Sequence, residues 1–179
     1  MDDNLEQQSL SIYCLDGFKV YRGQDLIPPQ KWRRQKVTLL FQYLLVADKP
    51  VPRHILLSLF WPHLEEAAAR HNLAVTLYDL RRTLQPKHPT NQAPLYIKSV
   101  GSYIELDWNS VAFYDVQAFK SFYREGVDAF SKEQWDQAVA ALIAANKLYQ
   151  TDFIPDAQED WIIEERAWLK NVRLDVLEH

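Results

Sequence analysis

The 179-residue sequence has a single cysteine, only four glycines and no long apolar run. Cys14 alone makes neither an internal disulfide nor a cysteine-based zinc site, which agrees with a reducing compartment. The glycines are too dispersed for a dinucleotide fingerprint or a phosphate-binding P-loop. No stretch approaches the roughly 18 to 20 apolar residues of a membrane span, and no signal peptide opens the chain. We therefore expect a cytoplasmic protein that does not engage a membrane.

Recognisable catalytic motifs are also missing. No trio of Ser, His and Asp and no carboxylate pair occurs in a known catalytic pattern. The histidines, which have no ligand-like spacing, are His54, His63, His71 and His88. We therefore expect no enzyme activity, no cofactor and no metal site.

The composition, with 47% hydrophobic and 13% aromatic residues, is typical of packed globular structure, except in residues 1–8, which we expect to be a disordered tail. The net charge of −4 hides an uneven distribution. Residues 31–100 hold eleven Lys and Arg against four acids, whereas residues 111–179 hold seven against thirteen. This asymmetry favours an anionic partner for the first half. The plainer alternative is two ordinarily solvated faces.

Short apolar runs between residues 9 and 27, broken by the turn dipeptides Asp16–Gly17 and Arg22–Gly23, predict a small antiparallel sheet. A helix is expected from about Arg34 until Lys49–Pro50. A second should follow Pro52 and end at Trp61–Pro62, and its expected buried residues are Leu56, Leu59 and Phe60.

The third helix, across residues 66–84, carries an apolar stripe of Leu73, Leu77, Leu80 and Leu84 that must face a core. Its opposite side would present Ala68, His71, Val75, Tyr78, Asp79 and Arg82, flanked by Arg70, Asn72, Thr76 and Arg81. Runs at 95–100 and 103–106 around Gly101–Ser102 predict a hairpin. A leading sheet, three helices and a hairpin form a winged helix-turn-helix arrangement.

Beyond Asp107 the sequence predicts helices only. The first is expected to end near Gly126, because glycine commonly closes helices. The second carries Trp135, Ala138, Val139, Leu142 and Ala145. The third is expected from about Asp156, with Glu159 completing a capping box.

No fourth helix is available to close this helical bundle, so we expect the sequence to be part of a longer one. Leu177, Glu178 and His179 are either a natural helix end or the remnant of an affinity tag. The acidic cluster of Asp156, Glu159, Asp160, Glu164 and Glu165 is either a contact for a basic partner or, as we prefer, a solvated helix start.

Short motifs occur in a fixed order along both halves of the chain. Those in the first half are the Arg33–Arg34–Gln35 run, residues 56–61, Ala69–Arg70, residues 80–82 and residues 103–107. Those in the second half are Val111, Asp115, Phe119, Trp135, Ala138, Trp161, Glu165, Arg166, Leu169, Arg173 and Leu174. In these motifs the chain resembles the antibiotic-regulatory-protein (SARP) family of bacterial transcription activators. The second helix of that half also looks like half a tetratricopeptide repeat.

The resemblance implies an α+β fold in which an OmpR-type winged-helix DNA-binding domain, at residues 9–108, precedes an all-α, tetratricopeptide-like bacterial transcriptional activator domain, at residues 109–179. It implies a regulator that binds promoter DNA in two or more copies and contacts RNA polymerase or another protomer. The family pattern has a glycine directly before the hairpin tyrosine, where this chain has Ser102.

The candidate DNA-binding residues are cations and polar groups on or beside the third helix. They are Arg33, Arg34, Lys36, Arg70, Asn72, Thr76, Tyr78, Arg81, Arg82 and Lys98. Asp79 would repel phosphates, so we expect it to orient a neighbouring arginine. The alternative function is a protein-interaction scaffold whose winged helix binds no DNA.

Overall fold

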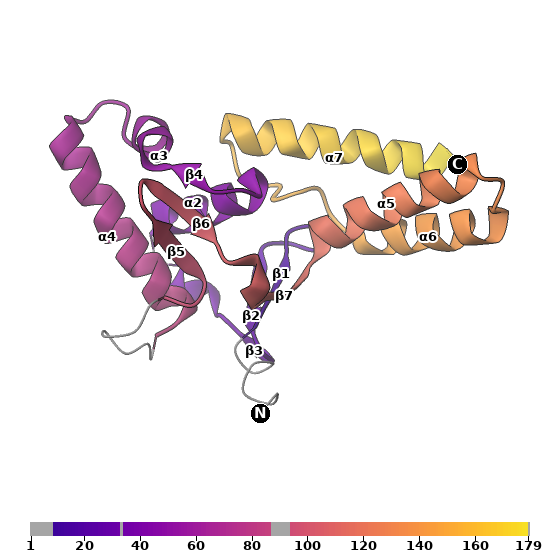
Figure 1. Cartoon of the computed structure of the whole chain (residues 1–179), viewed down its shortest axis with the longest axis horizontal. Coiled ribbons are helices and arrows are strands. Elements are labelled where there is room, and N and C mark those ends of the chain that lie inside the picture. Colours follow the sequence, from indigo (N-terminus) through magenta and orange to yellow (C-terminus); the bar gives the residue numbers. More distant parts are fainter. Residues whose placement is uncertain (1–8, 33, 87–93, 179) are drawn as a thin grey trace. The chain divides into compact units, whose positions relative to one another are not determined.

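The computed structural model describes residues 9–32, 34–86 and 94–178 (Figure 1). The chain is α+β and divides into two compact units. One is residues 27–110, and the other joins residues 9–26 to residues 111–178. The predicted tail at residues 1–8 lies outside the described residues. Within the described part of the chain, no helix is long and apolar enough to cross a membrane.

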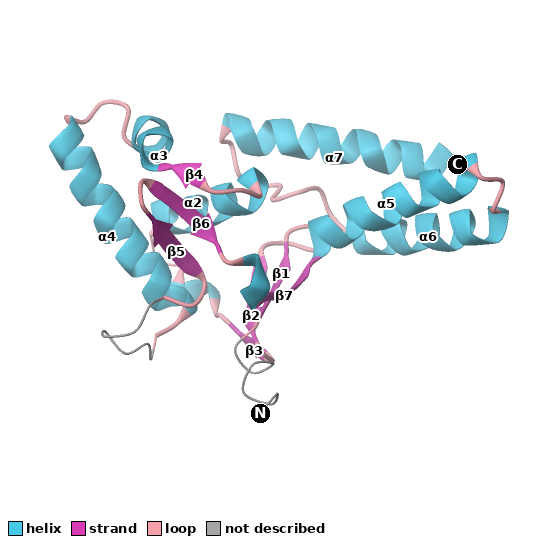
Figure 2. Ribbon diagram, viewed as in Figure 1, coloured by secondary structure: helices cyan, strands magenta, loops and turns pink. Residues whose placement is uncertain are grey.

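The unit of residues 27–110 contains three α-helices and a three-stranded sheet (Figure 2). The helices are α2 (Gln35–Ala47), α3 (Arg53–Phe60) and α4 (Glu66–Leu84), and two short 3-10 helices are η1 (Pro29–Lys31) and η2 (Trp108–Ser110). The sheet has the order β4-β6-β5, from β4 (Val51–Pro52), β5 (Ile97–Val100) and β6 (Tyr103–Leu106). The three predicted helices and the hairpin are therefore confirmed, whereas β4 was not foreseen.

The core of this unit comes from one apolar face of each helix. The leucine stripe of α4 is buried as predicted, with Leu73, Leu77, Leu80 and Leu84 at most 3% exposed. The prediction for α3 is wrong at one position, because Leu59 is 41% exposed and Leu57 is buried instead. The short helix turns its Leu56–Leu57–Phe60 face inward, and Leu59 lies on the opposite side.

The β5–β6 hairpin turns at Gly101, whose φ of 57° lies in the left-handed region that glycine adopts without strain. Two further contacts fix the hairpin to the start of α3. Val51 pairs with Ile104 across β4 and β6, and the Arg53 N–H donates to the carbonyl oxygen of Ser102 at 2.8 Å. The hairpin turn therefore lies beside the first turn of α3.

The second unit begins with a four-stranded sheet of order β3-β2-β1-β7. Its strands are β1 (Leu10–Tyr13), β2 (Lys19–Arg22), β3 (Asp25–Leu26) and β7 (Val111–Tyr114). The first three pair antiparallel as predicted, and β7 pairs parallel to β1. The expectation that strands end at Asp107 is wrong, because β7 completes the sheet. This pairing is also why residues 9–26 group with the C-terminal helices rather than with residues 27–110.

Three helices complete the second unit: α5 (Asp115–Ser131), α6 (Trp135–Leu148) and α7 (Asp160–Glu178). The predicted end of the first helix near Gly126 is wrong. Gly126 lies inside α5, where a Cβ would come within 2.7 Å of the Leu142 side chain of α6. Glycine here permits close packing of the two helices. The third helix begins at Asp160, not at Asp156, because the chain from residue 150 to residue 157 is held in a loop.

Candidate nucleic-acid interface

Helix α4 presents an exposed face opposite its leucine stripe. His71, Tyr78 and Arg82 are all exposed, and Tyr78 is 58% exposed despite its large ring. The Arg82 guanidinium donates to Tyr78 Oη at 3.4 Å and lies 5.9 Å from the centre of that ring. The leucines thus hold α4 to the core while an aromatic ring and a cation remain on its outer side.

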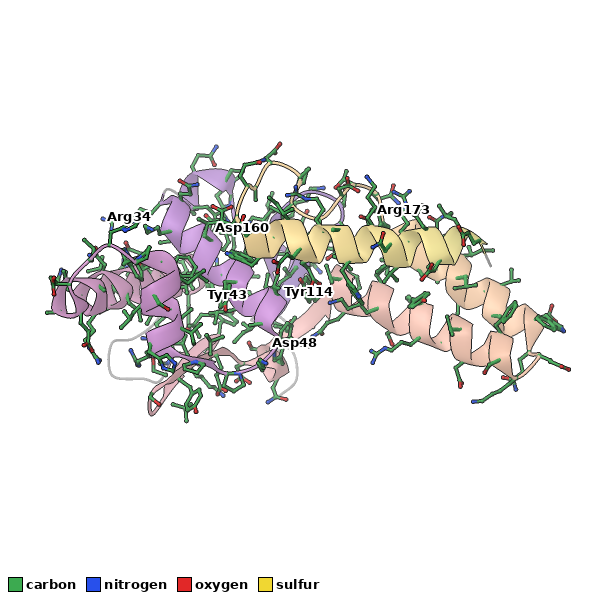
Figure 3. The ribbon with its side chains drawn as sticks, turned by 90° about the horizontal axis from the view of Figure 1, so that it is seen from above. Arg34, Tyr43, Asp48, Tyr114, Asp160 and Arg173 are labelled. Atoms are coloured by element: carbon green, nitrogen blue, oxygen red, sulfur yellow. The ribbon has the colours of Figure 1, made fainter. Side chains whose placement is uncertain are left out.

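Asp79 forms an ion pair with Arg34, whose guanidinium lies 2.7 Å from Asp79 Oδ2. Arg34 immediately precedes α2 and is labelled in Figure 3; its side chain is 65% exposed. The pair matches the expected orienting role of Asp79, with Arg34 as the arginine. It fixes an exposed guanidinium beside α4 while leaving much of its surface accessible.

Two candidate DNA-binding side chains of α4, Thr76 and Asn72, turn back onto their own helix. Thr76 is only 7% exposed and its hydroxyl donates to the Asn72 carbonyl oxygen at 2.8 Å. Asn72 is half-buried, and its amide donates to the Ala68 carbonyl oxygen at 2.9 Å. The exposed placement predicted for Thr76 is therefore wrong, because threonine readily bonds the carbonyl one turn back and buries its methyl group.

Arg81 links α4 to the β5–β6 hairpin. Its Nε donates to the Ile97 carbonyl oxygen at 3.0 Å, and a terminal nitrogen donates to the Ser99 hydroxyl at 2.7 Å. Burial, and then the nearby charge of Arg53, lower the pKa of Arg81. Arg81 is thus a bond between two elements as well as a positive charge.

Two further predicted cations, Arg70 and Lys98, already have partners in their own unit. Arg70 pairs with Glu66 one turn earlier, with Arg70 Nε 2.8 Å from Glu66 Oε1. Lys98 Nζ lies 2.5 Å from Asp107 Oδ2. Burial raises the pKa of Asp107, but the contacts with Lys98 and the hydrogen bonds from Asn109 together outweigh it, so the pKa lies below its ordinary value.

Lys36 is bound to the end of α3. Its ammonium donates to the Phe60 carbonyl oxygen at 2.6 Å and lies 5.3 Å from the centre of the Trp61 ring. Arg33 lies outside the described residues. The structure therefore brings Arg34, Tyr78 and Arg82 together on or beside the exposed side of α4, and gives Lys36, Arg81 and Lys98 internal partners.

One feature of this unit was missed by sequence reasoning. A cavity of about 600 Å³ lies among α3, the first turns of α4 and the hairpin turn. Its polar lining includes Arg53, His54, Ser58, Arg70 and Ser102. The sequence feature that points to this cavity is the run Arg53–His54 directly after Pro52, which places a cation at the start of a helix.

The second unit has a polar framework of its own, which includes two residues that carried the family resemblance, Glu165 and Arg166. Arg166 of α7 donates to the carbonyl oxygens of Phe153 and Ala157, each at 2.8 Å. Lys120 of α5 contacts Glu165 of α7 at 2.7 Å. These half-buried bonds fix the helices, so Glu165 and Arg166 are explained by packing within the unit. Among the described residues, no group of His, Cys, Asp and Glu is arranged to hold a metal ion.

The two units, one with a basic helix face and the other with a four-stranded sheet and three helices, define an α+β architecture. Residues 114–179 match the family described as "Bacterial transcriptional activator domain". This match confirms the predicted resemblance to SARP-type bacterial transcriptional activators.

A solved structure has the same fold. It is EmbR of Mycobacterium tuberculosis in complex with a low-affinity phosphopeptide, with a TM-score of 0.72 and 17% sequence identity. The likeness covers 93% of this chain and 43% of the EmbR chain, so the chain spans less than half the length of that relative. No curated protein matches the chain in sequence.

Proposed function

We propose that the chain is a transcriptional activator of the SARP kind whose residues 27–110 form an OmpR-type winged helix-turn-helix that binds promoter DNA. The observation that carries the proposal is the exposed, cationic and aromatic side of α4, held outward by the buried leucine stripe. Arg81 supports it by bonding α4 to the hairpin, because a helix and a hairpin in fixed relation suit two adjacent grooves.

In this proposal α4 is the recognition helix and enters the major groove, which is wide enough for one α-helix. Arg82 and Tyr78 face base edges or the nearest phosphates. Arg34, held by Asp79, neutralises a backbone phosphate and sets the register, since phosphate contacts position a protein and base contacts specify the sequence. The β5–β6 hairpin is the wing, and its exposed Val100 and Tyr103 meet the adjacent minor groove.

The activator domain at residues 114–179 would contact RNA polymerase or a second protomer, so that two or more copies occupy one promoter. Because bacterial promoter DNA lies in the cytoplasm, this function would be carried out there. The contact of the activator domain is supported by three exposed apolar side chains of α6, which a partner would cover. They are Trp135, Val139 and Ile143.

A salt series with the full chain on random duplex DNA tests the proposal. Fluorescence anisotropy should show binding at low salt, with log affinity falling against log salt by about 0.9 for each phosphate neutralised. Three or more contacts, from Arg34, Arg82 and the hairpin, predict a slope of about −3 or steeper. Absence of binding at low salt would support the alternative, a scaffold whose winged helix binds no DNA, because the cations of α4 would then serve only their contacts within the unit.

A further inference from the structure

The cavity among α3, α4 and the hairpin turn concentrates positive charge. Arg53 and Arg70 both line it, and Arg53 lies close enough to Arg81 to lower its pKa. The one acid in the lining, Glu66, already pairs with Arg70. No ion pair of Arg53 occurs within the described residues. Arginines that lie close together with only one neighbouring carboxylate indicate that an external anion balances their charge.

The cavity also carries the hydrogen-bond donors that an oxyanion needs. Ser102 and His54 join the arginines around it, whereas the Ser58 hydroxyl already donates to carbonyl oxygens of its own helix. Leu57 and Trp61 add apolar lining. Arg53 is fixed at the backbone, because its N–H is bonded to Ser102 of the turn. The guanidinium is thus presented from a rigid junction of two elements.

The place of the cavity in the fold points to one kind of anion. In the proposed complex α4 occupies the major groove and the hairpin reaches the adjacent minor groove. The sugar–phosphate strand that separates these two grooves must then pass between α4 and the hairpin turn. The cavity lies between those two elements.

We propose that this cavity binds a backbone phosphate of the strand that separates the two grooves, with Arg53 as the principal contact and Ser102 as a donor. The inference rests on the proposed function and adds Arg53 and Ser102, which are not among the predicted DNA-binding residues. Arg70 shares its charge between Glu66 and the phosphate. The cavity would therefore fix how far α4 and the hairpin advance into their grooves together.

The test compares three variants of the chain with the unmodified chain on one duplex, selected for binding from a random library. Arg53→Gln removes the principal charge and keeps the backbone bond to Ser102. Ser102→Asp places a carboxylate beside the phosphate. Arg124→Gln, an exposed residue of α5, removes the same charge from the other unit and is the matched control. Circular dichroism melting verifies that each variant remains folded.

Loss of one phosphate contact should flatten the log–log salt slope by about 0.9 and weaken binding about eightfold near 0.1 M salt. We expect this result for Arg53→Gln, a larger loss for Ser102→Asp and no change of slope for Arg124→Gln. Ethylation interference should show one phosphate whose modification blocks the unmodified chain but not Arg53→Gln. That phosphate should lie between the major-groove and minor-groove contacts.

The outcomes separate the two claims. If the unmodified chain binds no duplex at low salt, the proposed function fails, and this inference with it. If the unmodified chain binds and Arg53→Gln retains its slope, the cavity holds no phosphate and only this inference is overturned; an acidic protein segment would then be the remaining occupant. A slope change of equal size in Arg124→Gln would overturn it as well, since the effect would then reflect total charge.

Discussion

The carboxylate of Asp115 accepts hydrogen bonds from the backbone N–H of Cys14, at 2.7 and 2.9 Å, across a separation of 101 residues. It accepts another from the N–H of Leu15 at 2.7 Å. Asp115 is the first residue of α5 and is 1% exposed, so the bonds join the end of β1 to the start of the helical array. This bond network explains why residues 9–26 belong with the C-terminal unit. It also gives that unit a titratable group at its centre.

Replacing Asp115 with alanine should destabilise the chain. At about pH 5 the substitution leaves two buried N–H groups without an acceptor, and we expect the free energy of unfolding to fall by about 2 to 4 kcal/mol. Urea denaturation followed by circular dichroism measures it. Asp128→Asn is the matched control, because Asp128 is exposed and pairs with the exposed Lys132 one turn later, so its loss should change the free energy by less than about 0.5 kcal/mol. Equal effects of the two substitutions would contradict the account.

The stability of this unit should fall as the pH rises from about 4 to about 6. Burial raises the pKa of Asp115 to about 6 from the ordinary 3.8, against the lowering effect of the N–H donors. The folded state then binds more protons than the unfolded state within this window, so stability is greatest below it and is lost as the pH rises through the folded pKa. The total loss is of the order of 3 kcal/mol.

The measurement is the difference in unfolding free energy between the unmodified chain and Asp115→Asn, taken at several pH values. As the pH rises from about 4 to about 6, the unmodified chain should lose stability relative to Asp115→Asn. Above about pH 6 the difference in unfolding free energy should stay constant. Cys14 and Tyr114 are buried beside Asp115, but burial raises the pKa of each well above its ordinary value, so both stay neutral across the window. A difference that does not vary between pH 4 and pH 7 would exclude Asp115 as the titrating group.

Gly126→Ala should destabilise the helical unit, although alanine favours helices over glycine by about 1 kcal/mol. The new Cβ would lie within 2.7 Å of the Leu142 side chain, and such overpacking costs about 1 to 3 kcal/mol. Thermal melting of the single variants and of Gly126→Ala/Leu142→Ala gives the coupling. The alanine at 126 should cost clearly less when Leu142 is truncated; the same cost in both backgrounds would mean that α5 and α6 do not approach closely at this point.

Arg81 and Arg82 are adjacent in sequence but should respond differently to substitution by alanine. Arg81→Ala removes the bonds to Ile97 and Ser99, so the unfolding free energy should fall by about 1 to 3 kcal/mol. Arg82→Ala touches only the exposed Tyr78, so stability should be unchanged while DNA affinity falls about eightfold near 0.1 M salt. Parallel melting and anisotropy titrations measure both. An Arg82 variant that melts early but binds normally would reverse the two roles.

The sequence predicted the elements with strong periodicity and missed those that depend on distant partners. Helix α4 was predicted at its observed bounds, because four leucines at helical spacing leave one orientation for the helix. Strand β7 was missed since a four-residue strand has little signal of its own and exists here by pairing with β1, about a hundred residues away. The end of α5 was misplaced for the same reason: only the packing of Leu142 shows why position 126 is glycine.

In the candidate interface too, features set by helical periodicity were predicted and features that depend on distant partners were missed. The exposure of Tyr78 and Arg82 was predicted from the helical pattern alone, because residues opposite a buried stripe face outward. The internal bonds of Thr76, Arg81 and Lys36 depend on partners in other turns or other elements. These hydrogen-bond partners therefore could not be predicted from the sequence. The cavity at Arg53 forms where α3, α4 and the hairpin turn pack together, and the sequence alone does not show which elements pack together.

The most direct measurement of the central claim is photocrosslinking from the outer side of α4. A benzophenone side chain replacing Tyr78, which is 58% exposed, should form an adduct with a bound duplex on irradiation. The same group replacing Trp135 of α6, which is 55% exposed, should form none. An adduct from position 78 and not from position 135 is the result we predict. No adduct from position 78 on a duplex that the protein binds, or equal adducts from both positions, would contradict recognition by α4.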